Sequence, residues 1–182
     1  MMNTETLEAH LSKRRLLPDL YGGITVDSEN DIVTFPLWNL SGQMVGFQQY
    51  RRGAPKACHG KPSEQKYFTL LSKAGGRHSM LSCFGLDLLG SHSKVVFLGE
   101  GVLDISPLHL RKANALAVLM NDPKPLKRWL RSWGYHLVAL CEGDKAGRKL
   151  ANVAHESVYL PEGQDPGDQP NSWFDNLVAN YS

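Results

Sequence analysis

Acidic side chains follow three apolar segments in the second half of this 182-residue sequence. Glu100 ends the apolar segment 94–100, Glu142 and Asp144 lie at the end of segment 135–142, and Asp165 and Asp168 follow segment 157–161. Carboxylates held close together raise one another's pKa, and a bound divalent cation removes that cost. Mg²⁺ prefers oxygen ligands and often combines one or two carboxylates with water and phosphate. The residue types therefore favour Mg²⁺ or Mn²⁺ and metal-assisted phosphoryl transfer.

Strands and helices are predicted to alternate through this half of the chain, which indicates an α/β fold. Strands are expected at 94–100, 115–120, 135–142 and 157–161, and helices at 103–113, 125–134 and 144–155. Such alternation is typical of a parallel sheet with right-handed crossovers. Because the carboxyl ends of parallel strands share one edge, we expect the acids to converge there. Taken singly, each acid is equally typical of a solvated loop residue.

The first half of the sequence has a different pattern of apolar and polar residues, which predicts a smaller α+β subdomain. A short helix is expected within 4–17, a hairpin from 32 to 50 with its turn at 39–42, a basic loop at 51–66 and a helix at 78–90. The expected domains are 1–92 and 93–170, with 171–182 as a tail that is either a short helix or frayed.

Composition excludes several classes of protein. The sequence is 42% hydrophobic and has no apolar run approaching the ~20 residues of a membrane span and no signal-peptide core, so a cytoplasmic protein is expected. Its three cysteines are widely spaced. Cys58-His59 has no second ligand pair, so neither a disulfide framework nor zinc is expected.

Positive charge is concentrated in two places despite a net charge of only +2. Seven Lys or Arg residues and one acid, Glu64, lie between residues 51 and 78. Lys124, Lys127, Arg128 and Arg131 form a second cluster with no acid between them. Local basic patches of this kind favour polyanionic partners.

Three segments together resemble the TOPRIM module: "VVFLGEGVLDISPL", "LCEGDKAGRKLA" and "LPEGQDPGDQP". They match its Glu-Gly after the first strand, its acidic pair with Ala-Gly after the third, and its late Asp-Pro. Upstream, "VTFPLWNLSGQMVGFQQYR", "QKYFTL" and "SMLSCFGLDLL" resemble the segment before TOPRIM in bacterial-type (DnaG-like) and phage primases. The resemblance covers roughly residues 8–170 and corresponds to the RNA-polymerase core only.

The resemblance implies a DNA primase that joins ribonucleotides on a single-stranded DNA template during replication, and its small size suggests a phage source. Glu100 would be a metal ligand or general base, with Glu142 and Asp144 the principal ligands, Asp165 an outer ligand and Asp168 a further one. The nucleic-acid or nucleotide contacts would come from Arg51, Arg52, Lys66, Tyr67, Lys73, Arg77 and Lys145. Expected partners are single-stranded DNA, ribonucleoside triphosphates and a replicative helicase or a separate zinc-binding template-recognition protein, with no membrane.

Some positions depart from that family's pattern. Glu142 replaces the usual first Asp, Asn121-Asp122 stands where Gly-Thr or Gly-Ser is common, and Asp168 is one residue further from Asp165 than usual. Two alternatives therefore stay open: a TOPRIM nuclease or nicking enzyme, and a non-catalytic nucleic-acid or replisome-binding module. For Asp104, a helix cap is the simpler interpretation, and Trp129 and Trp133 are expected to pack on the sheet.

Overall fold

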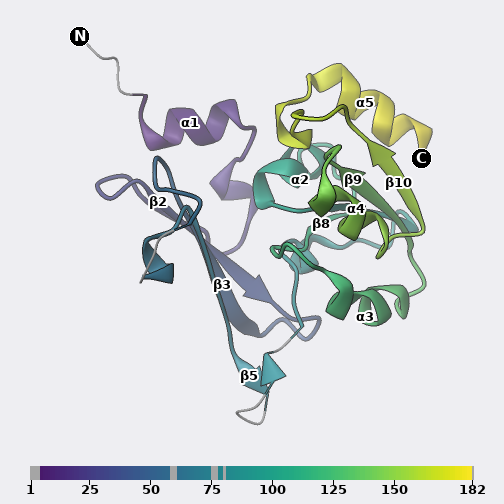
Figure 1. The fold of residues 1–182 in the computed structure, drawn as a ribbon, viewed down its shortest axis with the longest axis horizontal. Helices are drawn as coiled ribbons and strands as arrows, with labels where there is room; N and C mark the ends of the chain where they lie inside the picture. The colour runs from purple at the N-terminus through teal and green to yellow at the C-terminus, as the bar shows by residue number, and fades with distance from the viewer. Residues whose placement is uncertain (1–4, 58–60, 75–77, 80, 182) are drawn as a thin grey trace. The chain divides into compact units, whose positions relative to one another are not determined.

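The computed structural model describes residues 5–57, 61–74, 78–79 and 81–181, which divide into two compact units, Met1–Ser82 and Cys83–Ser182. The first unit contains a mainly antiparallel sheet and the second a parallel one (Figure 1). The sequence placed the boundary ten residues later, after residue 92. Residues 83–92 lie in the second unit, where Phe84 forms a β-bridge with Ala117.

The first unit is built on an antiparallel sheet in the order β1-β2-β3-β4. Its strands are β1 Thr25–Asp27, β2 Ile32–Trp38, β3 Met44–Arg51 and β4 Tyr67–Leu71. The predicted hairpin is confirmed in β2 and β3. At its turn the Asn39 side chain accepts hydrogen bonds from the amides of Ser41 and Gln43, and Gly42 adopts φ +73°. The first unit also contains short pieces: η1 Pro18–Leu20, η2 Pro62–Glu64, β5 Lys73–Ala74 and β6 His78–Ser79.

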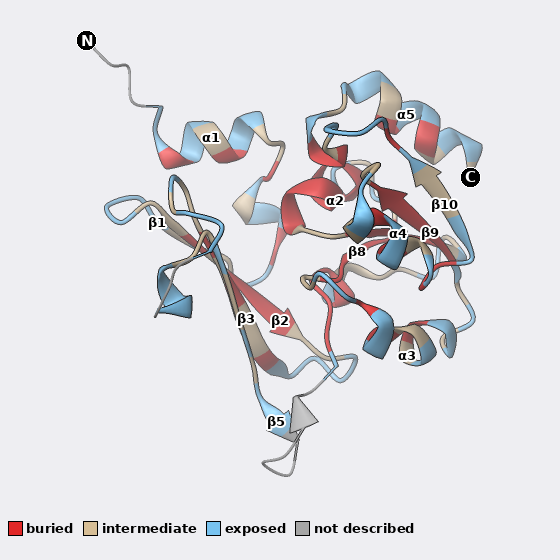
Figure 2. Cartoon of the chain, viewed as in Figure 1, coloured by how far each residue is buried: buried red, intermediate tan, exposed pale blue. Residues whose placement is uncertain are grey.

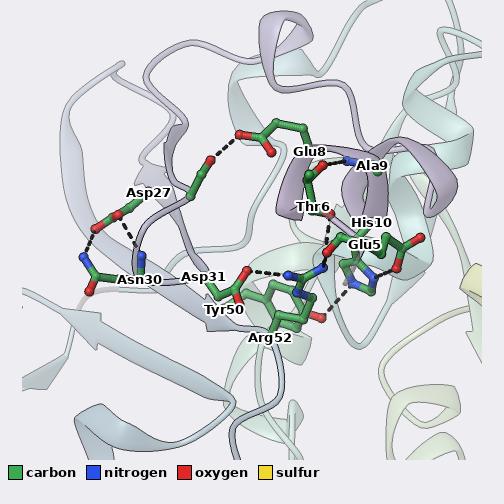
Figure 3. Close-up of polar contacts among 11 residues, drawn as sticks. Glu5, Thr6, Glu8, Ala9, His10, Asp27, Asn30, Asp31, Tyr50 and Arg52 are labelled. Carbon is green, nitrogen blue, oxygen red and sulfur yellow. Dashed lines mark hydrogen bonds and ion pairs between the residues drawn. The ribbon is translucent and has the colours of Figure 1, made fainter. Parts of the chain in front are cut away.

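The predicted N-terminal helix forms as α1, Leu7–Lys13, and one arginine fixes its start (Figure 3). The guanidinium of Arg52 donates hydrogen bonds to the carbonyls of Glu5 and Thr6 and pairs with the Asp31 carboxylate at 2.7 Å. Through these contacts Arg52, which follows β3, links the start of α1 to Asp31, which precedes β2.

The predicted helix over 78–90 is wrong. The described residues of this segment form the short strand β6 and a single 3₁₀ turn, η3 Leu86–Leu88. Phe84 is held extended by its exchange of backbone hydrogen bonds with Ala117, and Gly85 takes a left-handed conformation at φ +96°. The pairing of Phe84 and the left-handed Gly85 prevent an α-helix from running through this segment.

The second unit contains the predicted parallel sheet, in the order β10-β9-β7-β8. Its strands are β7 Val95–Gly99, β8 Ala115–Ala117, β9 His136–Cys141 and β10 Glu156–Tyr159. The three pairings are parallel and in register, with Leu98 opposite both Ala139 and Leu116. β7 and β9 are central and almost wholly buried, as expected of strands covered on both faces.

Helices cover both faces of this sheet. They are α2 Val102–His109, η4 Lys124–Leu126, α3 Lys127–Arg131, α4 Lys145–Ala151, η5 Pro166–Asp168 and α5 Asn171–Asn180. Leu126 and Leu130 of η4–α3 and Leu150 of α4 share one apolar core with Leu98 and Ala139. Trp129 and Trp133 pack against that core with their rings 4.4 Å apart, as predicted.

The opposite face of the sheet is covered by α2 and α5. Gly99 lies against Ile105 of α2, and the ring of Phe97 meets that of Tyr181, just after α5, at 5.6 Å. α2 is buried along its whole length, as are most residues of β8 and β9 (Figure 2). In the described ranges, no helix has the length and apolar character that crossing a bilayer requires.

The C-terminal segment forms a helix, α5, that packs against the rest of the second unit. Phe174 and Leu177 of α5 are buried. Arg111, just after α2, pairs with Asp175 at 2.7 Å, donates to the carbonyl of Asn171 and lies 5.4 Å from the Phe174 ring. Of the two predicted alternatives for this segment, the helix is therefore the one observed.

Replacing Phe174 with alanine should destabilise the second unit by about 3–4 kcal/mol, because a fully buried ring leaves a cavity. Urea unfolding of Phe174→Ala measures this, with the exposed Asn176→Ala on the same helix as the control, expected within about 0.5 kcal/mol of wild type. Equal stability of the two variants would mean that α5 does not pack as described.

Removing the Arg52 guanidinium should release the start of α1. We expect Arg52→Ala to cost about 2 kcal/mol locally, since it loses two hydrogen bonds to carbonyls and an ion pair. Hydrogen exchange of α1 should then accelerate about thirtyfold, measured by mass spectrometry against Lys56→Ala, an exposed lysine on the following loop. Unchanged exchange in α1 would contradict the network of Figure 3.

Candidate acidic active site and basic surfaces

The parallel sheet brings together the acids that the sequence placed at three strand ends. Glu100 directly follows β7, Glu142 directly follows β9, and Asp165 lies six residues after β10. Because β7, β9 and β10 run parallel, their carboxyl ends lie on the same edge of the sheet.

Two glycines allow the acidic loops to approach one another closely. A Cβ on Gly147 would lie 2.1 Å from the carbonyl oxygen of Glu142, so α4 packs directly on the backbone of the preceding acid. A Cβ on Gly143 would lie 2.8 Å from the amide nitrogen of Glu162, in the loop after β10. Side chains at these two positions would push the loops apart.

Helix capping orients two of the acids. Asp144 Oδ1 accepts a hydrogen bond from the Gly147 amide at 2.8 Å and caps α4, and Asp165 Oδ1 accepts one from Gly167 at 2.6 Å and caps η5. Each carboxylate is thereby fixed by one oxygen. Asp144 is exposed to solvent, so its other oxygen is accessible to a ligand.

The pKa of Glu100 is strongly raised. Burial contributes most to this shift and the charges of Glu142, Asp144 and Asp165 contribute the rest, and together they raise the pKa from 4.5 to about 7. Its Oε1 is buried and has no hydrogen-bond partner in the described part of the chain. Glu100 and Asp144 also contribute, after burial, to a raised pKa of about 12 for the Cys141 thiol. Three of the five predicted acids, Glu142, Asp144 and Asp165, therefore act electrostatically on a fourth, Glu100.

Asp168 is the fifth predicted acid. It is exposed on η5 and is not among the charges that shift the pKa of Glu100. Its assignment as a further metal ligand stays a prediction.

The four acids suit a divalent cation chemically. A buried carboxylate oxygen without a partner, beside three other negative charges, is the environment that a hard cation stabilises. Among the residues that the structure describes, no three Asp, Glu, His or Cys side chains are already gathered as a metal cage.

We call the edge of the parallel sheet that carries Glu100, Glu142, Asp144 and Asp165 the acidic edge. The loop after β8 is hydrogen-bonded to this edge through its backbone, a feature that the sequence did not reveal. The amide of Leu119 donates to the carbonyl of Glu100 at 2.9 Å, and Leu119 adopts φ +59°, unusual for a leucine. Asn121 and Asp122 are exposed, and Asp122 Oδ1 accepts from the Lys124 amide at 3.2 Å.

Asp104 is a helix cap, as the simpler interpretation predicted, since its Oδ2 accepts a hydrogen bond from the Gly101 amide at 2.7 Å.

In the first unit, Lys66 and two tyrosines form a compact basic and aromatic group. The Lys66 ammonium lies 5.9 Å from the Tyr50 ring and 5.8 Å from the Tyr67 ring, and the two rings are 5.3 Å apart. Tyr50 is buried, whereas Tyr67 is 40% exposed. This geometry leaves the outer ring, Tyr67, able to stack on a base.

The other predicted cations differ in how far they are engaged. Arg51 donates one bond to Gln49 at 2.7 Å, while its Nη1 is buried without a partner among the described residues. Arg52 is committed to α1 and Asp31, as described above. Lys73 and Lys145 are exposed, the latter beside Asp144 at the start of α4. Arg77, like Cys58 and His59, lies outside the described residues.

Searches of protein-family models and of curated proteins find no match for this sequence. Solved structures do match. The DnaG primase catalytic domain bound to ssDNA superposes with a TM-score of 0.60 at 16% identity, over 95% of this chain and 58% of its own. The E. coli primase catalytic core gives 0.56 at 18% identity, over 89% and 54%. The primase fragment of the bacteriophage T7 primase-helicase gives 0.57 at 13% identity, over 87% and 65%.

These matches define the fold: the chain has the mixed α/β fold of primase catalytic cores. More particularly, it has the fold shared by the DnaG and phage T7 primases, which confirms the resemblance found in the sequence at the level of structure. The chain spans about 54–65% of the length of these three structures.

The raised pKa of Glu100 predicts that the protein loses stability as the pH rises. The folded protein holds the Glu100 proton up to about pH 7, whereas the unfolded chain releases it near 4.5. The resulting stabilisation is complete below about pH 4.5 and is lost as the pH rises through 7. Glu100→Gln should escape this loss. Between about pH 5 and 8 in metal-free buffer it should gain about 1 kcal/mol relative to wild type, a figure reduced for solvent screening.

Urea unfolding at a series of pH values measures this difference, with the exposed Glu162→Gln as a control that should follow wild type. Added Mg²⁺ should raise the melting temperature of wild type at pH 8 more than that of Glu100→Gln. Parallel pH profiles for wild type and Glu100→Gln would show that Glu100 is not held among the other carboxylates.

Proposed function

We propose that this protein synthesises RNA primers on single-stranded DNA, as a DNA primase acting in DNA replication. The observation that carries this proposal is the buried, unpartnered oxygen of Glu100 beside Glu142, Asp144 and Asp165 at the edge of the parallel sheet. The fold of primase catalytic cores supports it. Acidic clusters that hold divalent cations beside phosphates are the usual setting for nucleotidyl transfer.

Each acid has a distinct part in this chemistry. Glu142 and Asp144 would hold Mg²⁺ or Mn²⁺ as principal ligands, with Asp165 further out. The cation, when bound, would neutralise charge on the triphosphate and lower the pKa of the attacking hydroxyl. Glu100 has a pKa near the working pH, so its carboxylate suits either a ligand role or acceptance of the proton from a primer 3′-hydroxyl.

The basic and aromatic residues of the first unit would bind the template. Lys66, Lys73, Arg51 and Arg77 would contact phosphates, which fixes the position of the strand without reading its sequence. Tyr67 would stack on an unpaired base. Arg52, occupied by α1 and Asp31, would contribute mainly by holding this surface in shape. Lys145, which follows Asp144 at the start of α4, would contact a nucleotide phosphate.

Three of the matching structures support a proposal about partners. One matching structure is a primase domain bound to single-stranded DNA, and another comes from a primase-helicase protein. A further match, to the Aquifex aeolicus primase, includes a zinc-binding domain beside the polymerase domain. We therefore propose single-stranded DNA and ribonucleoside triphosphates as substrates, and a helicase or a zinc-binding template reader as the protein partner.

Removing one negative charge at the acidic edge should abolish synthesis while leaving the fold intact. Asp144→Asn keeps a side-chain oxygen that can cap α4 but loses the carboxylate charge. We expect primer synthesis to fall at least about a hundredfold. The assay incorporates labelled ribonucleotides on single-stranded DNA with Mg²⁺ or Mn²⁺.

Asp168→Asn is the matched control, because Asp168 is an acid of the same edge that does not shift Glu100. Its effect should be much smaller, within about tenfold. Gel analysis of the same reactions separates extension from cleavage of the DNA, and cleavage products alone would favour the nuclease alternative. Wild-type levels of primer synthesis by Asp144→Asn would rule out the acidic edge as the active site.

A further inference from the structure

A second basic surface lies on the side of the parallel sheet that is covered by α3 and α4. Lys124, Lys127, Arg128 and Arg131 line a shallow depression of about 540 Å³, together with Ser132. Their spacing of three, four and seven residues places the four cations along one side of the continuous η4–α3 helix. We call this group the α3 basic stripe.

The cations of the stripe lack acidic partners. None of the four has an ion pair within the described ranges, whereas Arg52 and Arg111 elsewhere in the chain do. Arg131 is anchored differently, because its guanidinium donates to the carbonyls of Val153 and Ala154, at the end of α4. Four like charges crowded on one short helix without compensation cost stability, and a bound polyanion would offset that cost.

The stripe follows a loop that begins at the acidic edge. The loop that leads into it is hydrogen-bonded to Glu100 through the Leu119 amide, and Asp122 receives the amide of Lys124. From Lys124 the stripe runs along the helix away from that edge, over about 10 Å at 1.5 Å per residue. A strand leaving the acidic edge would therefore meet Lys124 first and Arg131 last.

The shape of the stripe selects a linear ligand. Its depression is open and shallow, and no buried polar side chain lines it, so it is unsuited to enclosing a single nucleotide. A line of cations about 10 Å long is longer than one phosphate group, so it suits an extended phosphodiester backbone rather than a single phosphate. The residues are cations with no aromatic ring among them, which suits phosphate contacts without base recognition.

We infer that the α3 basic stripe binds the phosphodiester backbone of a nucleic-acid strand that extends from the acidic edge. This inference deepens the proposed function and rests on it, because the strand in question is the template or the growing primer. The binding is independent of base sequence and adds to the contacts proposed for the first unit.

The test compares two triple variants that remove the same positive charge. Lys124→Gln with Lys127→Gln and Arg128→Gln removes the free cations of the stripe and spares Arg131, which holds α3 to the end of α4. Lys13→Gln with Lys112→Gln and Lys149→Gln removes three exposed lysines elsewhere. Circular dichroism and melting temperature verify that both variants fold.

Binding of a labelled oligodeoxythymidylate is measured by fluorescence anisotropy over a range of KCl concentrations, with no nucleotide present. The stripe variant should bind about tenfold more weakly. Its plot of log affinity against log salt should be shallower by about 2, since each lost phosphate contact on a single strand removes about 0.7. The control variant should keep the wild-type slope, apart from a small uniform loss of affinity.

Two results would overturn the inference: equal slopes and affinities for the two triple variants, or loss of binding to labelled polyglutamate by the stripe variant while its DNA binding is kept. The second result would identify an acidic protein segment as the ligand. Primer synthesis by wild type is assayed in parallel. A shallower slope without any synthesis would support the stripe and contradict the proposed function, whereas synthesis with an unchanged slope would contradict the stripe alone.

Discussion

Mutual repulsion of carboxylates at one edge of a parallel sheet is the constraint on which the second unit depends. Glu100, Glu142, Asp144 and Asp165 come from three strand ends, and three of them raise the pKa of the fourth. A protein that only had to be stable would not place a half-buried glutamate with an unpartnered oxygen there. The cost is intelligible if the edge is built for a ligand that carries the opposite charge, which a divalent cation does.

The rest of the second unit can be understood as the support for that arrangement. Gly147 lets α4 approach the backbone of Glu142, and Gly143 lets the loop after β9 approach the loop after β10 at Glu162. Asp144 and Asp165 each give one oxygen to a helix cap, so both carboxylates are held in position before any ligand arrives. α5 closes the opposite face of the sheet, where Phe174 and Arg111 join it to the end of α2.

The two units contribute different chemistry to the proposed reaction. The first offers cations and exposed aromatic surface on an antiparallel sheet, around Lys66 and Tyr67. The second offers concentrated negative charge at one edge and the α3 basic stripe leading away from it. A polymerase needs both signs of charge, because phosphate backbones are held by cations whereas the reacting phosphates are handled by metal-binding acids.

The sequence alone determined the alternating elements of the second unit, the parallel sheet and the acids at its edge, because strand–helix alternation leaves few topologies and parallel strands end on one side. It also determined the hairpin of the first unit through its turn residues. It could not determine that residues 78–90 avoid a helix, since the Phe84–Ala117 bridge joins positions 33 residues apart. Nor could it show that Arg52 binds the carbonyls at the start of α1 or that the Leu119 amide donates to the Glu100 carbonyl. Those outcomes depend on contacts between segments distant in the chain, which local propensity and spacing do not encode, and only the tertiary structure decided them.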